Sequence, residues 1–372
     1  MRITDIQLNS FRNYADQRFQ PSAGVNIIIG PNAQGKSNLL EAVYLLATTK
    51  SHRTNRDADM VNVNADATRV RAEVERIEQN DVTLEINISR SEKKSVKINT
   101  VRHSKIADAI GQLNAVIFSA EDLAMIKGEP SERRRFLNLE VSQISGEYIY
   151  ALAGYKRAVM QRNALLKAIK MEGAGMDTLP AWDEQLVGFG AVMMRWRVEF
   201  VKRLAALASP IHSQLTDGAE ELGIEYEPSF DLGEASSAEE IEMVYRKALE
   251  DCRRQELARA TTVRGPHRDD IAFHINEMDV RYFGSQGQQR TAALAVKLAE
   301  IRLVEDMVGE SPVVLLDDVT AELDEKRRSH IFDLTCGRCQ TFATATETGE
   351  FPVEIVSQSA IFEVLKSQVT PR

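Results

Sequence analysis

The feature that most constrains this chain is a phosphate-binding loop at residues 30–37. Its sequence, GPNAQGKS, matches the pattern G-x-x-x-x-G-K-[S/T] of P-loop nucleotidases. An apolar segment at 25–29 precedes the loop, and residues 38–47 follow it with apolar side chains on one helical face. A strand, a glycine-containing loop and a helix in this order predict a nucleotide-binding α/β core.

The composition of the loop suits a triphosphate. Gly30 and Gly35 let phosphate oxygens approach the backbone closely, because no Cβ is in the way. Backbone N–H groups converge at the start of the following helix, where the peptide dipoles favour an anion. We expect Lys36 to reach the β- and γ-phosphates of ATP, and the Ser37 hydroxyl to bind Mg²⁺. The residues expected to contact the nucleotide are Gly30, Pro31, Asn32, Ala33, Gln34, Gly35, Lys36 and Ser37.

A second motif, far along the chain, is an apolar strand that ends in two acids. Residues 313–316 are VVLL, typical of a buried parallel strand, and Asp317 and Asp318 follow. We expect Asp317 to hold Mg²⁺, directly or through water, and Asp318 to orient the water that attacks the γ-phosphate. A helical segment separates this motif from the phosphate loop, so the sequence predicts one ATPase core split by an insertion.

A third motif is a Ser-x-Gly-Gln segment, formed by Ser285, Gly287 and Gln288, that precedes a predicted helix. A hydroxyl and backbone N–H groups at a helix N-terminus make an anion site. The position of the segment shortly before Asp317 is similar to that of the signature motif of ABC-type ATPases, which completes the γ-phosphate site of the opposite subunit. Residues 321–324, AELD, follow at the spacing of the D-loop of that class.

The rest of the chain divides into three regions. Residues 1–126 contain alternating apolar segments, typical of an antiparallel sheet with one face in water. Residues 127–263 are mostly helical, with two long amphipathic helices joined by a loop at 171–180 that contains Gly and Pro. Residues 264–372 return to alternating strands and helices. The pattern predicts an α/β head with a mixed sheet, formed by 1–126 and 264–372, and a helical hairpin domain inserted at 127–263.

The composition limits the class of protein. With 372 residues, 43% hydrophobic and 27% charged, the chain resembles an ordinary globular protein. No run reaches the roughly 18 apolar residues of a membrane helix, and residues 1–6 lack a signal-peptide pattern. We therefore expect a cytoplasmic protein without a membrane partner. The net charge of −9 argues against a uniformly basic surface, but it allows a local basic patch.

The cysteines do not indicate a disulfide framework, since the chain has only three. Cys336 and Cys339 form a C-x-x-C. No second pair of Cys or His completes a zinc set, and no thioredoxin-like βαβ pattern surrounds the pair. We expect neither a metal nor a redox role for them.

Several basic clusters are candidates for contacts with DNA phosphates. A charged run is often only a solvated surface, and the run at 133–135 has the alternative of burial against acids of the insertion. The sequence contains no base-reading module such as a zinc finger, so binding would depend on DNA structure and salt. The candidates are Lys50, Arg53, Arg56, Lys94, Arg102 and Lys105.

Taken together, these motifs resemble those of the RecF family, DNA-repair ATPases of the SMC/ABC class. GPHRDD and GSQGQQR are the most specific of the matches. The resemblance implies a P-loop ATPase head of the ABC/SMC type that uses ATP and Mg²⁺, dimerises around two nucleotides and holds DNA. The matching segments lie at 11–14 (FRNY), 30–37, 50–54 (KSHRT), 118–122, 128–137 (GEPSERRRFL), 265–270 (GPHRDD), 284–290 (GSQGQQR) and 315–324.

The resemblance also implies a biological role in DNA replication, recombinational repair and the SOS response. A weak, DNA-dependent ATPase would clamp DNA as an ATP-bound homodimer at single-strand gaps. It would help the mediators RecR and RecO to load RecA, and slow hydrolysis would release it. Asp318 and Ser285 would act from opposite subunits. Residues 341–346 lack the switch His of ABC transporters, so the γ-phosphate sensor is unassigned; Glu121 or Asp122 is a candidate for the Q-loop position.

Three other classes fit the sequence less well. A transporter ATPase subunit would have a compact core, a switch His and a membrane partner. An SMC-type tether would need arms of several hundred residues, whereas 127–263 permits only a short hairpin. A P-loop protein that binds ATP without hydrolysing it is disfavoured by the adjacent acids Asp317 and Asp318.

Overall fold

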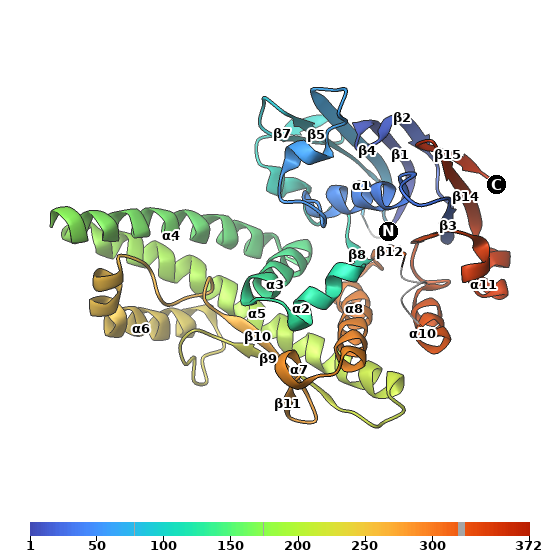
Figure 1. Cartoon of the computed structure of the whole chain (residues 1–372). Coiled ribbons are helices and arrows are strands. Elements are labelled where there is room, and N and C mark those ends of the chain that lie inside the picture. Colours follow the sequence, from blue (N-terminus) through green and yellow to red (C-terminus); the bar gives the residue numbers. More distant parts are fainter. Residues whose placement is uncertain (78, 174, 319–323) are drawn as a thin grey trace. The chain divides into compact units, whose positions relative to one another are not determined.

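The computed structural model describes residues 1–77, 79–173, 175–318 and 324–372. These residues form two compact units (Figure 1). The first unit comprises Met1–Asp122, Gln214–Asp217 and Ala293–Arg372, and the second comprises Leu123–Ser213 and Gly218–Ala292. Within the described ranges, no helix is long and apolar enough to cross a membrane.

The first unit contains a mixed sheet with the strand order β15-β14-β3-β13-β12-β8. All neighbouring strands pair in parallel, except that β15 is antiparallel to β14. The predicted strands at 25–29 and 313–316 are confirmed as β3 and β12, and every residue in both is buried. The strands are β3 (Val25–Ile29), β8 (Ala115–Phe118), β12 (Val313–Leu316), β13 (Thr341–Ala345), β14 (Ala360–Leu365) and β15 (Gln368–Pro371).

The first unit also contains an antiparallel sheet with the order β2-β1-β4-β5-β6-β7. Buried and partly buried residues alternate along β5, so one face of this sheet lies in the core, as predicted. The strands are β1 (Arg2–Phe11), β2 (Tyr14–Phe19), β4 (Ala67–Glu75), β5 (Val82–Ser89), β6 (Ser95–Ile98) and β7 (Val101–His103).

Helix α1 (Lys36–Thr48) contacts strands of both sheets, and it is buried along most of its length. Leu39 and Leu46 of α1 belong to the same apolar core as Ile6 of β1 and Phe342 of β13. The helix that follows the phosphate loop is therefore held from two sides. The other described helices of the first unit are η1 (Asp57–Met60), η2 (Ile106–Ala109), η3 (Ala120–Asp122), α10 (Glu325–Thr335), η5 (Thr348–Glu350) and α11 (Val353–Gln358).

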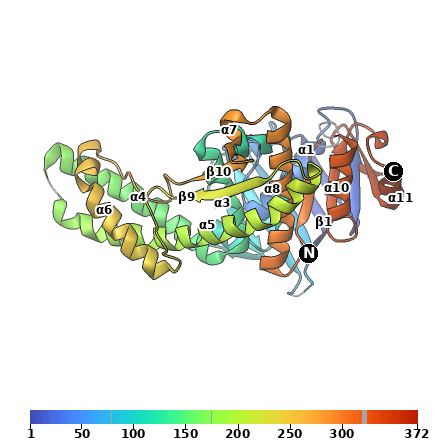
Figure 2. The same ribbon diagram turned by 90° about the horizontal axis from the view of Figure 1, so that it is seen from below.

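The second unit is mainly helical (Figure 2). The two long helices of the predicted hairpin are α4 and α5, and the predicted capping box of Ser237 and Glu240 opens α6. The elements that lie in this unit or begin or end in it are α2 (Leu123–Lys127), α3 (Pro130–Ile144), α4 (Gly146–Glu172), η4 (Met176–Thr178), α5 (Leu179–Leu215), β9 (Leu222–Glu227), α6 (Ala238–Arg259), β10 (Asp270–Ile275), β11 (Met278–Asp279), α7 (Val280–Phe283) and α8 (Gln286–Val308).

Strand pairing crosses the domain boundary expected at 263/264. β10 pairs with β9 along six residue pairs, from Asp270 with Glu227 to Ile275 with Leu222. The second compact unit therefore extends to Ala292. The predicted division has one domain made of 1–126 with 264–372 and a second made of 127–263. It stays a prediction about how the chain divides functionally.

A buried ion pair joins the residue after β4 to the chain beyond α8 within the first unit. Arg76 Nε lies 2.9 Å from Glu310 Oε1, and both side chains are 1% exposed. Burial raises the pKa of the Glu310 carboxyl, but hydrogen bonds from the Ile77 N–H and from Arg76 outweigh this effect, and the pKa is lowered overall. Glu310 is therefore held in its charged form.

We predict that Glu310→Gln lowers the free energy of unfolding by about 3 kcal/mol near neutral pH, because it leaves the buried Arg76 without its counter-charge. Since the folded pKa of Glu310 lies below the ordinary value of 4.5, its contribution is present above that pH and is lost as the pH falls through the folded value. Urea unfolding at several pH values measures both effects.

The matched control is Glu75→Gln. The pair of Arg2 and Glu75 is exposed, with 51% and 41% of the two side chains accessible, so its loss should cost less than about 1 kcal/mol. Equal effects of the two substitutions would contradict a special contribution from the buried pair.

Candidate functional site

The phosphate loop has the backbone shape that its glycines permit. Gly30 and Gly35 adopt φ of 149° and 118°, in the region that favours glycine. A Cβ at Gly30 would lie 2.4 Å from the Val364 carbonyl oxygen, and one at Gly35 would lie 2.6 Å from the Asn13 amide. Both glycines are thus required by neighbouring backbone and side chains as well as by any phosphate.

Lys36 folds back over the loop that precedes it. Its Nζ donates to the carbonyl oxygens of Gly30, at 2.8 Å, and Pro31, at 3.3 Å, and the residue is 4% exposed. The charge is therefore held at the loop by protein oxygens. These bonds place the ammonium where loop N–H groups and a bound polyphosphate would meet, which fits a nucleotide site.

The turn at 11–14 supports the loop from outside, a role that the sequence analysis did not assign. Asn13 Nδ2 donates to the Gln34 carbonyl at 2.8 Å, and the Tyr14 hydroxyl donates to the Gly35 carbonyl at 3.0 Å. Asn38 Nδ2 of α1 donates to Asn13 Oδ1 at 2.7 Å. Burial raises the pKa of the Tyr14 hydroxyl, so it stays a neutral donor.

A buried acid on α1 joins this turn to the segment at 50–54. Glu41 has no exposed surface, and its carboxylate accepts from Arg12 at 2.5 and 2.8 Å and from the Ser51 hydroxyl. Arg53 lies 3.6 Å from Glu41 and donates to Asn38 Oδ1 at 2.7 Å. The sequence signal was an acid inside the otherwise apolar run LLEAVYLLA, and the sequence analysis did not use it.

The structure brings Ser37 and Asp317 together at one edge of the mixed sheet. Burial raises the pKa of the Asp317 carboxyl, and the nearby Ser37 side chain and a hydrogen bond from Thr344 act in the opposite direction. A hydroxyl and a carboxylate oxygen are ligands that Mg²⁺ accepts, with water and phosphate oxygens as the others. A buried acid whose charged form is disfavoured is also one that a cation would stabilise. The two residues therefore fit the predicted metal site.

Asp318 follows in an unusual backbone conformation. Its φ is 51°, in the left-handed region that few residues other than glycine adopt. Its N–H donates to Thr344 Oγ1 at 2.8 Å. Residues 321–323 of the expected D-loop lie outside the described residues, whereas Asp324 caps α10 by accepting from the Arg327 N–H.

Ser285 caps α8 in the second unit. Its hydroxyl accepts from the Gln288 N–H at 3.2 Å, and its own N–H donates to Gln288 Oε1 at 2.8 Å. These reciprocal bonds have the pattern of a capping box. Gln288 Nε2 also donates to Glu220 Oε1 at 2.8 Å. Ser285 and Gly287 are exposed, so another molecule can reach this helix start.

The candidate DNA contacts fall into two groups. Lys94 is largely buried, and its ammonium contacts Asp57 at 2.7 Å and the Thr49 carbonyl at 2.8 Å. Lys50 and Lys94 line one hollow of about 430 Å³ in the first unit, together with Asp57. The candidates that lie exposed are Lys50, Arg53, Arg56, Arg102 and Lys105.

The C-x-x-C pair consists of free thiols. Burial raises the pKa of Cys339 to about 12, and it raises that of Cys336 as well. Thiols with raised pKa values are weak nucleophiles and metal ligands at neutral pH. Among the residues that the structure describes, no group of three or more His, Cys, Asp or Glu could hold a metal ion.

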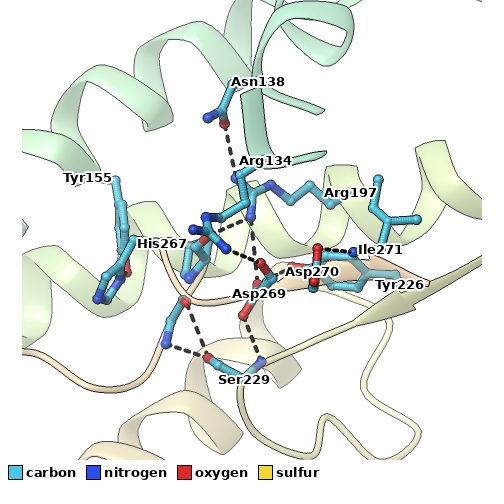
Figure 3. Close-up of polar contacts among 12 residues, drawn as sticks. Arg134, Asn138, Tyr155, Arg197, Tyr226, Ser229, His267, Asp269, Asp270 and Ile271 are labelled. Carbon is cyan, nitrogen blue, oxygen red and sulfur yellow. Dashed lines mark hydrogen bonds and ion pairs between the residues drawn. The ribbon is translucent and has the colours of Figure 1, made fainter. Parts of the chain in front are cut away.

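The segment GPHRDD, at 265–270, lies in a buried polar network of the second unit (Figure 3). Asp269 is fully buried; its carboxylate accepts from the Tyr226 hydroxyl and from the Ser229 N–H. Arg197, 1% exposed, lies 3.7 Å from Asp269 and donates to the Pro266 carbonyl at 2.6 Å. The network anchors the start of β10 to α5.

The neighbouring acid of this segment also has a buried partner. Arg133 of α3 is 3% exposed and donates two hydrogen bonds to Asp270, both of 2.7 Å. Arg133 is therefore buried against an acid, as the alternative for the run at 133–135 expected, but Asp270 lies outside the insertion at 127–263 that was expected to supply it. Asp269 and Asp270 of GPHRDD are thus held by buried or partly buried partners, whereas Arg268, which precedes them, is exposed.

His267 is held as a neutral imidazole between two partners. Its Nδ1 lies 2.7 Å from the Tyr155 hydroxyl, and its Nε2 lies 3.2 Å from the Thr262 carbonyl. The carbonyl only accepts, so Nε2 carries the proton and Nδ1 accepts from Tyr155. Burial lowers the pKa of His267 to about 4. Gly265, with φ of 121°, is required because a Cβ there would lie 2.3 Å from the Tyr155 oxygen.

We predict that the stability of the wild type falls more steeply between pH 6.5 and about 4 than that of His267→Gln. In this range the unfolded state binds a proton at His267 and the folded state does not, so folding becomes less favourable as the pH falls. A shift of the His267 pKa from 6.5 to about 4 on folding corresponds to a change of about 3 kcal/mol in the free energy of unfolding. Urea unfolding across this pH range is the measurement. Parallel pH profiles of the two proteins would contradict the prediction.

Comparisons with known proteins agree over the length of the chain. The family model described as the RecF/RecN/SMC N terminal domain matches residues 2–359. The DNA replication and repair protein RecF of Bacillus mycoides (strain KBAB4) is 42% identical over 370 residues, which cover 99% of this chain and 98% of that protein. The protein of the same name from Bacillus cytotoxicus is also 42% identical, with the same coverage.

Solved structures give the same result. The recombination mediator protein RecF of the RecFOR pathway, solved as RecF-ATPrS and as RecF-ATP, is 34% identical to this chain. Its TM-scores are 0.91 and 0.92, and the matches cover 100% of this chain and 98% and 97% of the others. An Smc head bound to the C-winged helix domain of ScpA matches with a TM-score of 0.56 at 16% identity, so it shares the fold.

Proposed function

The chain belongs to the RecF family, and from this premise we propose that it is an ATP-dependent DNA-binding protein of replication and recombinational repair. The observation that supports the proposal most directly is that Ser37 lies close to Asp317 beside the phosphate loop. A loop for phosphate, a hydroxyl and a buried acid at one sheet edge are the parts that a magnesium nucleotide requires.

The proposed hydrolysis site uses the chain's own residues as follows. The backbone of residues 30–37 and the Lys36 ammonium bind the β- and γ-phosphates, while Ser37 and Asp317 hold Mg²⁺. When bound, Mg²⁺ offsets charge on the phosphate oxygens. Asp318 orients the attacking water and accepts its proton.

We propose that the site is completed in trans. Ser285, Gly287 and Gln288 lie at an exposed helix start, and this helix start would contact the γ-phosphate held by a second copy. ATP binding would then close a homodimer, and hydrolysis would open it. The head that closes would be 1–126 with 264–372, and 127–263 would form an arm.

The closed dimer would hold DNA through exposed basic residues of the first unit. Relatives are named as DNA replication and repair proteins and as a mediator of the RecFOR pathway. By this likeness, we propose that the chain works in the cytoplasm at single-strand gaps with RecR and RecO, that it promotes loading of RecA, and that it takes part in the SOS response. Its ATPase would be weak and stimulated by DNA.

A complementation experiment tests the trans site. Lys36→Ala removes the charge from a copy's own loop, and Ser285→Arg blocks the helix start that the copy offers to its partner. We predict that each variant alone loses at least about 10-fold of the ATPase rate, and that a mixture regains activity because one composite site has both groups intact. The measurement is phosphate release at fixed total protein.

Light scattering with and without ATP supplies the control. The wild type should form a dimer that depends on ATP, and Ser285→Arg should not. A mixture with no more activity than the average of its two components, while both variants stay folded, would argue for a site complete within one copy.

The DNA contacts are tested through salt dependence. We predict that Lys50→Ala and Arg56→Ala each weaken binding to duplex DNA. Each should also make the slope of log K against log salt less steep, by up to about 0.9, because it removes one phosphate contact. Lys247→Ala, an exposed lysine of the second unit, is the matched control and should leave the slope unchanged. Equal slopes for all three variants and the wild type would place the DNA elsewhere.

A further inference from the structure

Thr344, near the end of β13, has a buried hydroxyl for which neither the sequence nor the proposed function supplies a role. All five residues of β13 are buried, and Thr344 is 1% exposed. Apolar side chains normally fill such positions. Burying a hydroxyl is unfavourable unless it finds partners, so the partners of Thr344 indicate what it does.

The polar contacts of the Thr344 hydroxyl lie at the end of β12. Oγ1 accepts from the Asp318 N–H at 2.8 Å, and it lies 3.0 Å from Asp317 Oδ1 and 3.2 Å from Asp318 Oδ1. The Leu316 carbonyl oxygen lies further away, at 3.4 Å. A hydroxyl has one hydrogen to donate, so these oxygens compete for it, and Asp317 is the nearest.

The contacts act on both acids in different ways. The Thr344 hydroxyl of β13 donates to Asp317 Oδ1 and so orients its carboxylate, and the Ser37 side chain of α1 lies near the same carboxylate. Asp318 has φ of 51°, and the bond from its N–H to Thr344 stabilises this left-handed turn. The direction of the Asp318 side chain depends on that turn.

Other threonines of the same segment have different partners. The Thr341 hydroxyl lies 3.4 Å from the Cys339 carbonyl, and the Thr346 hydroxyl donates to Glu350 Oε1 at 2.5 Å. The bonds to the two acids are therefore a property of position 344 and not of threonine in β13 generally. Thr341 offers a matched control in the same buried strand.

We propose that Thr344 is a positioning residue of the ATPase site, which fixes the carboxylate of Asp317 and the backbone turn of Asp318. The inference rests on the proposed function, since it assigns to these acids the roles given above. Residues that orient metal-binding carboxylates through a hydrogen bond commonly affect metal affinity or activity by about 10- to 100-fold. In this proposal Thr344 acts through the two acids, whose carboxylates its hydroxyl contacts.

The first test compares Thr344→Val, Thr344→Ser and Thr341→Val. Thr344→Val should lower kcat about 10-fold and raise the Mg²⁺ concentration for half-maximal turnover by a similar factor. Binding of a fluorescent ATP analogue in EDTA should stay within about twofold of the wild type, because the metal is absent there. Thr344→Ser keeps the hydroxyl and should behave like the wild type, as should Thr341→Val.

The second test needs no nucleotide. A double-mutant cycle combines Thr344→Val with Asp317→Asn. Thr344→Val should lower the urea concentration at the midpoint of unfolding more when residue 317 is Asp than when it is Asn, because the buried carboxylate then loses a hydrogen-bond donor. If Thr344→Val does not fold, Thr344→Ala replaces it in both tests.

The outcomes separate this inference from the proposed function. Additive effects in the cycle, or an equal loss of analogue binding with and without Mg²⁺, would overturn the positioning role. A shift of Mg²⁺ dependence in Thr341→Val as large as in Thr344→Val would do the same. A wild type that neither binds nor hydrolyses ATP would instead refute the proposed function, and the cycle would still decide whether hydroxyl and carboxylate are coupled.

Discussion

The parallel register of β3, β13 and β12 is the constraint on which the candidate site depends. Ile29 pairs with Ala345, and Leu316 pairs with Ala343, so the three strands end at the same edge of the sheet. The phosphate loop follows β3 and the acids follow β12. Backbone hydrogen bonds, and not attraction between the polar groups themselves, therefore bring Ser37 close to Asp317. A long insertion between the two motifs is tolerated because the register is set within the sheet.

Buried charge explains why several motifs of this chain are so specific in sequence. Glu41 is buried beside the partly exposed Arg12 in the first unit, and Asp269 and Arg197 are both buried in the second. Such pairs contribute little net stability when complete, but the loss of one member leaves an uncompensated charge. Each residue is thus constrained by its partner in a distant segment. The segments 11–14 and 265–270, which carry the family resemblance in the sequence, thus supply internal contacts of the first and the second unit respectively.

The sequence predicted what depends on local pattern. The strands at 25–29 and 313–316 and the fold class are confirmed, because alternation and apolar runs report directly on burial. It did not predict the pairing of β9 with β10, nor the contact of Thr344 with the acids. Both depend on which strands become neighbours, and hydrogen-bond partners that lie far apart in the chain leave no local signal.

The phosphate loop shows how far such distant contacts reach. Gln34 does not turn its side chain toward the inside of the loop; its Oε1 accepts from the Lys366 N–H in the turn between β14 and β15, at 2.7 Å. Val364 of the same hairpin leaves room only for a glycine at position 30. Asn13 and Tyr14 hold the other end of the loop through its carbonyls. These contacts are all made by protein groups, so they support the shape of the loop independently of phosphate, and such preorganisation lowers the cost of binding.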